Sequence, residues 1–235
     1  MTTAAPFHLA GEKLHLDPAG VLVWPAQRTL IVADLHLEKG SAAARRGQLV
    51  PPWDSRVTLD RLALLLRRLK PRCVVALGDS FHDDGGPQRL APDDAARLQA
   101  LTGAVDFIWV RGNHDKSPPE GLGGRAATEW RSGALVFRHE AQRGETGEVS
   151  GHFHPKARVA TRAGEVVRPC FVADARKIML PAFGAYTGGL DVGEEPIAKL
   201  FGARFHAYML GSERVYAIPR EQSGKGRNNA RIFAT

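Results

Sequence analysis

The residues of this chain that could do chemistry are concentrated in five short polar clusters. In chain order these read ADLH, GDSFHDD, RGNHD, FRHE and SGHFH. Imidazole, carboxylate and amide oxygen together favour a borderline divalent ion such as manganese, iron or zinc, and the set is too rich in nitrogen for calcium or magnesium. The candidate metal ligands are Asp34, His36, Asp79, Asn113, His139, His152 and His154.

Each cluster taken alone has an ordinary structural explanation. A single aspartate or histidine at a strand end usually caps or faces solvent, and Gly-Asn-His-Asp is also a favourable turn sequence. The five together are different, because burying so many polar groups without a metal would cost several kcal/mol for each group. The sequence therefore predicts a metal site.

Apolar runs precede the first three clusters and position them. Leu30–Ala33, Cys73–Leu77 and Phe107–Val110 are suited to buried strands. Strands of this kind that alternate with helices form a parallel sheet, whose carboxyl ends share one edge and bind ligands there. The two intervening helices are expected from Asp54, as the N-cap, to Pro71, and over Ala91–Leu101. The apolar face of the first helix carries Leu59, Leu62, Leu65, Leu66 and Leu69.

The second half of the chain changes character to short strands separated by turns. These strands are expected at Ala134–Phe137, Ala157–Ala160, Glu165–Val167, Lys177–Leu180 and Arg214–Ile218. They predict a second, mostly antiparallel sheet. The fold class is therefore α/β, with two sheets packed together and helices outside, in one domain over residues 1–220 followed by a polar tail over residues 221–235.

Local spacing adds two expectations about the clusters. In Asp34-Leu35-His36 and His152-Phe153-His154, residues two apart point to one side if the backbone is extended. Glycine precedes Asp79, Asn113 and His152, as a tight bend or a close approach of the backbone would require.

Composition narrows the partner and the compartment. The net charge of +7 and the pI of about 9.8 favour a phosphate-rich partner such as nucleic acid, although arginine usage can also reflect genome composition. Cys73 and Cys170 form no CxxC pattern, which favours a reducing compartment. No signal peptide or membrane-length apolar stretch is evident, so we expect a cytoplasmic location and no membrane partner.

In this order, D-x-H, G-D, G-N-H-D, H and G-H-x-H resemble the motifs of the calcineurin-like metallophosphoesterase superfamily. The resemblance implies a four-layer α/β/β/α sandwich of two mixed sheets flanked by helices. It also implies that Asp34, His36 and His154 hold one metal, that Asp79 bridges, and that Asn113, His139 and His152 hold the second metal. His114 would lie near the leaving group, oriented by Asp115.

A closer resemblance covers nearly the whole chain apart from the tail. The segments ADLHLEKGSAAARRG, ALGDSFHDDGG and LPAFGAYTGGLDV are similar to the ligase-associated DNA damage response endonucleases of bacteria. That family implies a metal-dependent phosphodiesterase acting on DNA, most of all single-stranded DNA, in repair alongside an ATP-dependent DNA ligase. Two divalent ions are expected, manganese before iron or zinc.

The residues support a two-metal mechanism. A hydroxide shared by two ions about 3.5–4 Å apart would attack phosphorus in line with the departing oxygen. His114, if protonated, would donate a proton to that oxygen. Further substrate contacts are expected from Lys39, Arg45, Arg46 and Arg111, with solvated surface as the alternative for each. His82 is a further substrate-binding candidate, which either holds the orientation of a metal ligand, the preferred reading, or covers the metal site.

Three aromatic residues lie outside the metal clusters and carry their own expectations. Tyr186 could stack a base, with core or turn packing as its alternative, and Trp53 and Trp109 are expected in the core. Two other functions stay open. The first is hydrolysis of a small nucleotide, such as a cyclic nucleotide or a dinucleotide, and the second is a non-catalytic phosphate-binding module.

Overall fold

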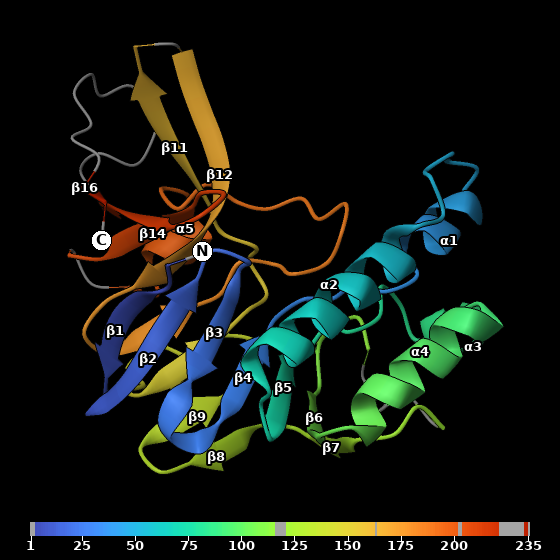
Figure 1. Ribbon diagram of the computed structural model, residues 1–235. Helices are drawn as coiled ribbons and strands as arrows, with labels where there is room; N and C mark the ends of the chain where they lie inside the picture. Colours follow the sequence, from blue (N-terminus) through green and yellow to red (C-terminus); the bar gives the residue numbers. More distant parts are fainter. Residues whose placement is uncertain (1–2, 116–120, 163, 202–203, 221–232, 235) are drawn as a thin grey trace.

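The computed structural model describes residues 3–115, 121–162, 164–201, 204–220 and 233–234 (Figure 1). Two β-sheets pack face to face. The first sheet has seven strands whose spatial order follows the chain: β1 (Ala5–Leu9), β2 (Glu12–Asp17), β3 (Val21–Trp24), β4 (Thr29–Val32), β5 (Cys73–Leu77), β6 (Asp106–Val110) and β7 (Arg125–Ala127).

The part of this sheet that follows β4 is parallel. Strands β4 to β7 pair in parallel, while β1 to β4 pair antiparallel. The predicted strands at Leu30–Ala33, Cys73–Leu77 and Phe107–Val110 are therefore β4, β5 and β6, and the parallel sheet is confirmed. As expected, the carboxyl ends of these three strands lie along one edge.

Helices cover one face of the parallel strands. The long helices are α2 (Asp54–Leu69) and α4 (Pro92–Gly103), and short ones are η1 (Pro25–Gln27), α1 (Lys39–Ala44) and α3 (Gly86–Arg89). Leu30 and Val32 pack with Leu59, Leu62, Leu65 and Leu98 of the long helices, whereas Ile31 packs against the second sheet. A strand buried on both faces must be apolar throughout, which is why the apolar runs here are continuous.

The start of α2 differs from the expectation. The N-cap is Trp53, and Asp54 is the first helical residue. The Asp54 carboxylate instead accepts hydrogen bonds from the backbone amides of Lys39 and Gly40, at 2.8 and 3.2 Å, where α1 begins. Asp54 therefore satisfies the amides of a neighbouring helix.

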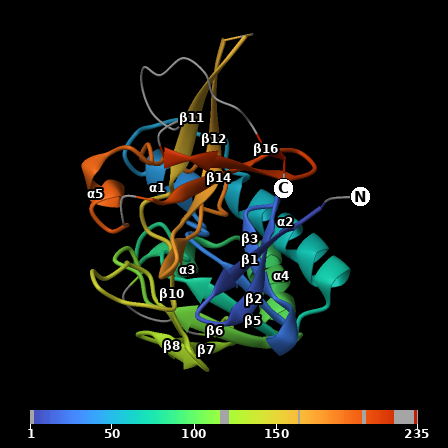
Figure 2. The same ribbon diagram turned by 90° about the vertical axis from the view of Figure 1, so that its left-hand side faces the viewer.

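The second sheet is mostly antiparallel, as predicted. Its strands are β8 (Trp130–Ser132), β9 (Leu135–Phe137), β10 (Glu148–Ser150), β11 (Lys156–Thr161), β12 (Gly164–Ala173), β13 (Lys177–Met179), β14 (His206–Leu210), β15 (Val215–Pro219) and β16 (Phe233–Ala234). The two parallel pairs described are β9–β10 and β10–β13. Strands β11 and β12 form a hairpin that stands out from the body of the molecule (Figure 1, Figure 2).

The layers agree with a two-sheet sandwich flanked by helices. Apolar residues from both sheets, among them Ile31, Val75, Phe137 and Phe171, fill the space between the sheets. The outer face of the second sheet is covered by β11 and by the segment around the short helix α5 (Glu195–Ala198). The helical layer on this side is thus much thinner than that formed by α2 and α4.

The structure describes only Phe233–Ala234 of the predicted tail, residues 221–235. Residues 221–232 and 235 of the predicted tail lie outside the described residues, but Phe233–Ala234 pair with β15 and so belong to the second sheet. No helix within the described part of the chain is long and apolar enough to cross a membrane.

Candidate metal centre

The seven predicted ligands follow the ends of five strands. Strands β4, β5 and β6 of the first sheet lead into Asp34 and His36, into Asp79, and into Asn113. In the second sheet, β9 leads into His139, and β10 leads into His152 and His154. Because β9 and β10 are paired in parallel, their carboxyl ends lie side by side, and this brings His139 next to His152.

One ligand group consists of Asp34, His36 and His154, whose ligand atoms all lie within 4.8 Å of one another. Nε2 of His36 is 3.1 Å from Nε2 of His154, which in turn is 3.6 Å from Oδ1 of Asp34. Asp34 is fully buried, and its carboxylate also accepts a hydrogen bond from the backbone amide of His152 at 3.0 Å.

The other ligand group consists of Asp79, His139 and His152. Nε2 of His139 is 3.0 Å from Nδ1 of His152 and 2.8 Å from Oδ1 of Asn113, so the amide of Asn113 joins this group. On its other side the His139 ring is held by a hydrogen bond from Nδ1 to the carbonyl oxygen of Leu77, at 2.9 Å. That bond fixes the ring so that Nε2 faces the group.

Asp79 connects the two groups. Its Oδ2 lies 3.8 Å from Nε2 of His36 and 3.4 Å from Nε2 of His139. Its Oδ1 accepts a hydrogen bond from the backbone amide of His114, at 2.9 Å. The backbone therefore orients one oxygen, and the other faces histidines of both groups.

Five of the seven predicted ligands have a left-handed backbone. The φ angles of Asp34, His36, Asp79, His152 and His154 lie between 43° and 78°. The extended backbone on which the same-side placement in Asp34-Leu35-His36 and His152-Phe153-His154 depended is therefore absent. Residues other than glycine rarely adopt this conformation, and strain of this kind gathers at functional sites.

The glycines before the ligands lie where the backbone has neighbours at close range, as predicted. A Cβ atom at Gly112 would stand 2.2 Å from the backbone nitrogen of Asp79. At Gly78 it would meet the His139 ring at 2.5 Å, and at Gly151 the Asp34 carboxylate at 2.7 Å. Only a residue without a side chain allows these loops to pack so closely.

The electrostatics of the groups fit divalent cations. Burial, followed by the charge of His154, lowers the pKa of His36 to about 3, so that the ring is neutral at neutral pH and one ring nitrogen has a free lone pair. Burial would also lower the pKa of His139, but the hydrogen bond to Asp79 and the charges of Asp34 and Asp79 raise it to about 9. Burial opposes the charge of Asp79, yet the hydrogen bond and charge of His139 hold the pKa of Asp79 below its usual range.

The raised pKa of His139 and the lowered pKa of Asp79 favour a protonated His139 beside an ionised Asp79 at neutral pH. Positive charge is thus favoured where the ligand atoms converge, and a bound cation would replace that proton. The residues present fit a pair of borderline divalent ions, with Asp34, His36 and His154 holding one, Asn113, His139 and His152 the other, and Asp79 shared.

His114 lies at the open side of the centre. Its Nε2 is 4.0 Å from Oδ2 of Asp79, and its Nδ1 bonds to the backbone carbonyl oxygen of His82 at 2.9 Å. The carboxylate of Asp115, predicted to orient His114, accepts from the backbone amides of Ser80, Phe81 and Gly112 instead. Burial raises the pKa of Asp115 to about 6, against the effect of these hydrogen bonds.

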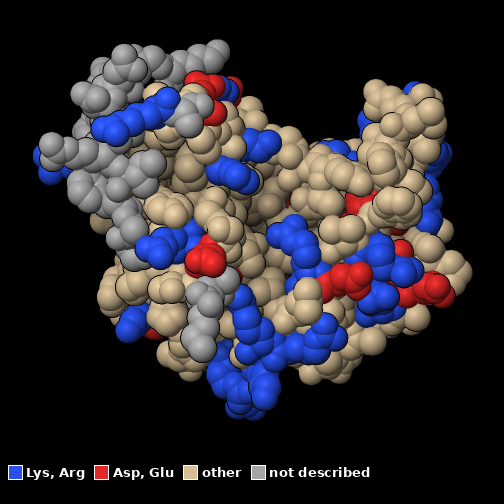
Figure 3. Space-filling model, turned by 45° about the horizontal axis from the view of Figure 1, so that its top comes forward, with Lys and Arg blue, Asp and Glu red and all other residues tan. Residues whose placement is uncertain are grey.

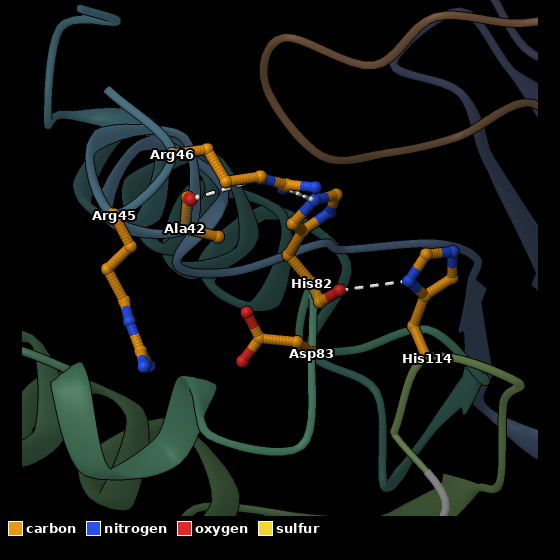
Figure 4. Close-up of a pocket in the computed structure, with 6 residues that line it drawn as sticks. All are labelled: Ala42, Arg45, Arg46, His82, Asp83 and His114. Carbon is orange, nitrogen blue, oxygen red and sulfur yellow. Dashed lines mark hydrogen bonds between the residues drawn. The ribbon is translucent and has the colours of Figure 1, made fainter. Parts of the chain in front are cut away.

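A pocket of about 430 Å³ adjoins His114 and is lined by Ala42, Arg45, Arg46, His82, Asp83 and His114 (Figure 4). The His82 and His114 rings are stacked with centroids 5.4 Å apart, and Nη2 of Arg46 is 3.0 Å from Nε2 of His82. The sequence thus identified three substrate candidates that share one cavity: Arg45, Arg46 and His82.

The remaining candidates differ in how far their side chains are exposed. Lys39 is half-buried at the start of α1, and Arg111 is exposed after β6. Tyr186 is 46% exposed, and Trp53, predicted in the core, is 66% exposed. Trp53 precedes the first turn of α2 and so lies outside the face that packs on the sheet, whereas Trp109 is buried as predicted.

One cation near the centre was not predicted. Lys156 begins β11, two residues after His154, and its charge and that of Arg46 both reach Lys39. In the sequence, Lys156 stands two residues after the G-H-x-H cluster. This closeness to a predicted ligand is the signal that could have identified Lys156.

Two groups of nitrogen and oxygen ligands, next to one carboxylate that faces both, lie at the strand ends of a two-sheet sandwich and could each hold a divalent ion. The calcineurin-like phosphoesterase model matches residues 27–181, which contain every predicted metal ligand. The chain belongs to the calcineurin-like phosphoesterase family, and it is a hydrolase that acts on phosphoester bonds. Members of this family use divalent metals.

Comparison with solved structures finds a nuclease, MPE, of Pseudomonas putida, with a TM-score of 0.70 and 28% identity over 92% of this chain and 100% of that chain. YfcE, a phosphoesterase from E. coli, matches with a TM-score of 0.40 and 17% identity, over 83% and 94% of the two chains. Among curated proteins, no significant match is found.

Proposed function

We propose that this protein is a dinuclear-metal-dependent phosphodiesterase that cleaves DNA internally and prefers single-stranded DNA. The observation that carries the proposal is the position of Asp79, whose Oδ2 faces His36 on one side and His139 on the other. A carboxylate shared in this way joins two ligand groups into one centre that can hold both non-bridging oxygens of a phosphate.

Nucleic acid as the substrate has two further supports. The Pseudomonas putida nuclease aligns along its whole length with this chain. Figure 3 shows a hollow on the face turned toward the viewer, and most charged side chains on that face are Lys and Arg. A hollow that is open and basic suits a polymer of phosphates, because cations displace its condensed counterions.

The residues around the centre have separate tasks in the proposed reaction. When bound, the two cations, manganese before iron or zinc, supply an activated water and stabilise charge on the phosphate. Asp34, His36, Asp79, Asn113, His139, His152 and His154 hold them. The doubly protonated form of His114 gives its Nε2 proton to the departing sugar oxygen, while its Nδ1–H donates to the His82 carbonyl, so that Nε2 faces the substrate.

The cations of the chain itself bind the substrate in this proposal. Arg45 and Arg46 hold the phosphate that follows the scissile one, in the pocket beside His114. Lys39 and Arg111 contact the backbone on either side. Asp115 acts indirectly, since it fixes the loop that carries Asp79 and the turn that carries His114.

The cellular role belongs to the same proposal. We place the enzyme in the cytoplasm, in DNA repair, with a functional link to an ATP-dependent DNA ligase. Both Cys73 and Cys170 are free and buried, which agrees with a reducing compartment.

The test is incubation of the purified protein with circular single-stranded DNA, circular duplex DNA and a cyclic nucleotide, each with manganese and with a chelator. Circles have no ends, so cutting them separates an endonuclease from an exonuclease. We expect manganese-dependent linearisation, fastest for the single-stranded circle. Failure of a metallated sample to cut either circle would overturn the proposal.

Hydrolysis of a small nucleotide is a second candidate, because the pocket beside His114 is large enough to enclose one nucleotide. The two candidates differ in their response to salt. Binding of DNA weakens steeply as salt is added, whereas hydrolysis of a small substrate changes little.

A further inference from the structure

The loop between β13 and α5 passes over the loops that carry the first ligand group. At its start, the amides of Phe183 and Gly184 donate to the carbonyl oxygens of Ala33 and Asp34, at 2.8 and 3.1 Å. At its end, the amide of Leu190 donates to the carbonyl oxygen of Phe153, at 3.2 Å. Figure 1 shows this orange loop reaching toward α2. Its two ends therefore lie beside the loops that carry Asp34 and His154, and its middle reaches α2, where the amide of Ala185 bonds to Thr58.

Two glycines let the loop lie flush against these ligands. A Cβ atom at Gly184 would stand 2.0 Å from the carbonyl oxygen of Leu35. One at Gly189 would stand 2.0 Å from the carbonyl oxygen of His154. Since no side chain fits at either position, the loop is held at a fixed distance from the metal centre.

Tyr186, in the middle of this loop, has a backbone conformation that is unusual for an aromatic residue. Its φ is 60°, in the left-handed region, which is costly for an aromatic residue. Its neighbours are anchored, because the amide of Ala185 donates to Oγ1 of Thr58 at 3.1 Å and Oγ1 of Thr187 donates to the carbonyl of Gly184 at 3.2 Å. The residue is nevertheless 46% exposed. Hydrogen bonds of its neighbours thus hold the backbone of Tyr186 in a strained conformation, while its side chain remains partly exposed to solvent.

Cations follow the two ligand loops beside which this loop is anchored. Lys39 begins α1 and Lys156 begins β11, and the charges of Lys156 and Arg46 both act on Lys39. Proteins bind single strands by combining cations, which contact the phosphates, with exposed aromatic side chains, on which the bases stack.

We propose that Tyr186 stacks on the unpaired base of the nucleotide beside the scissile phosphate, and that this contact is a source of the preference for single strands. The proposal rests on the proposed DNA-cleaving function. A base in a duplex is covered by its neighbours and cannot offer its face to the ring without unstacking. Every base has such a face, so the contact selects for unpaired DNA without selecting a sequence.

Two substitutions at this position separate stacking from structure. Tyr186→Phe keeps an aromatic ring. Tyr186→Asn removes the ring, and asparagine tolerates a left-handed backbone better than most residues. Leu64→Ala, at an exposed apolar residue on α2, is the matched control. For all three we expect unchanged metal content, and for Tyr186→Asn a thermal midpoint equal to or above that of the wild type.

The readout is a gel of end-labelled oligothymidylate that carries one abasic nucleotide, cut with manganese. For the wild type, Tyr186→Phe and Leu64→Ala, we expect reduced cleavage at one linkage at a fixed offset from the abasic position. Tyr186→Asn should lower cleavage of intact oligothymidylate by about 5- to 150-fold, the range of one base stacked on an aromatic ring, and should abolish the position-specific reduction.

Two results would overturn the inference while leaving the proposed function intact. One is Tyr186→Asn cutting intact single strands at the wild-type rate. The other is a reduction beside the abasic nucleotide that is as deep in Tyr186→Asn as in the wild type. Absence of any DNA cleavage by the wild type is a different result, because it contradicts the proposed function itself.

Discussion

At the scale of single residues, Asp79 and His114 have roles that the geometry separates. Asp79 is buried and faces histidines of both ligand groups. The His114 side chain is 42% exposed, and Nε2 stands at the edge of the centre, 4.0 Å from Asp79. One residue is placed to hold cations and the other to meet a substrate, so their substitutions should differ in metal content.

Asp79→Asn should lose metal from both groups and lose activity with it. The amide can still accept the hydrogen bond from the His114 backbone, but its NH₂ group would point at His36 and His139, where a cation needs an anionic ligand. Elemental analysis and circular dichroism check this. A folded variant with a full complement of metal would contradict the shared role of Asp79.

His114→Ala should keep its metal and lower kcat by about 10²–10⁴-fold, the contribution of a positioned proton donor. The loss should be smaller for a substrate whose leaving group needs no proton, such as a nitrophenyl ester. Exposed His8 on β1 provides the control, since His8→Ala should leave both metal and kcat unchanged. A metal-free His114→Ala protein would instead make this histidine a ligand.

The sequence was informative about which residues form the centre and less so about how the backbone presents them. Ligand types and the glycines before Asp79, Asn113 and His152 identified the clusters, because those choices are local. The left-handed backbone of Asp34 and His36 was not predicted, since it depends on contacts with Asp79 and Gly184 that are distant in sequence. The partners of Asp115 were missed for the same reason.

At the scale of elements, the apolar runs identified β4, β5, β6, α2 and α4, because each is a continuous or periodic pattern in a short window. Pairing is not local, and the parallel neighbours of β10 could not be predicted. That pairing matters for the site, since β9 and β10 deliver His139 and His152. The structure also shows what holds β10 in this position.

A buried ion pair joins β10 to β13. Glu148 and Lys177 are opposite each other in the parallel register, with Nζ of Lys177 2.7 Å from Oε2 of Glu148, and both are almost fully buried. Lys177 also donates to the carbonyl of Gln142, whose amide donates to Glu148. The pair therefore fixes both the strand and the segment after His139.

Glu148→Gln should destabilise the protein by about 3–5 kcal/mol, because it leaves the charge of Lys177 buried without its partner. Urea unfolding of metal-free protein measures the effect. The double variant Glu148→Leu with Lys177→Met should recover much of the loss, while Arg131→Ala, in an exposed pair with Glu129, should change stability by less than about 0.5 kcal/mol. A single variant as stable as the wild type would show that the pair does not hold β10.

At the scale of the whole molecule, the fold determines where the basic residues behind the net charge of +7 gather. The sequence alone could not separate a basic surface for nucleic acid from a general arginine excess. The structure brings Arg46 and Lys156 close enough for the charge of each to act on Lys39. They come from α1 and from the start of β11, so only the fold gathers them.

Binding of single-stranded DNA should therefore depend steeply on salt. If Lys39, Arg45, Arg46 and Lys156 each neutralise one phosphate, the slope of log affinity against log salt is about −2 to −3, at roughly 0.7 per contact on a single strand. Anisotropy of a labelled oligothymidylate, titrated with metal-free protein so that no cleavage occurs, measures that slope.

Removing one of these cations should flatten the slope by about 0.7, whatever the base sequence of the oligonucleotide. Lys156→Ala is the most informative change, because this residue carries charge near the centre but is not a ligand. Lys13→Ala, at an exposed lysine on β2, should leave the slope unchanged. Equal slopes for Lys156→Ala and the wild type would mean that Lys156 contacts no phosphate of the bound strand.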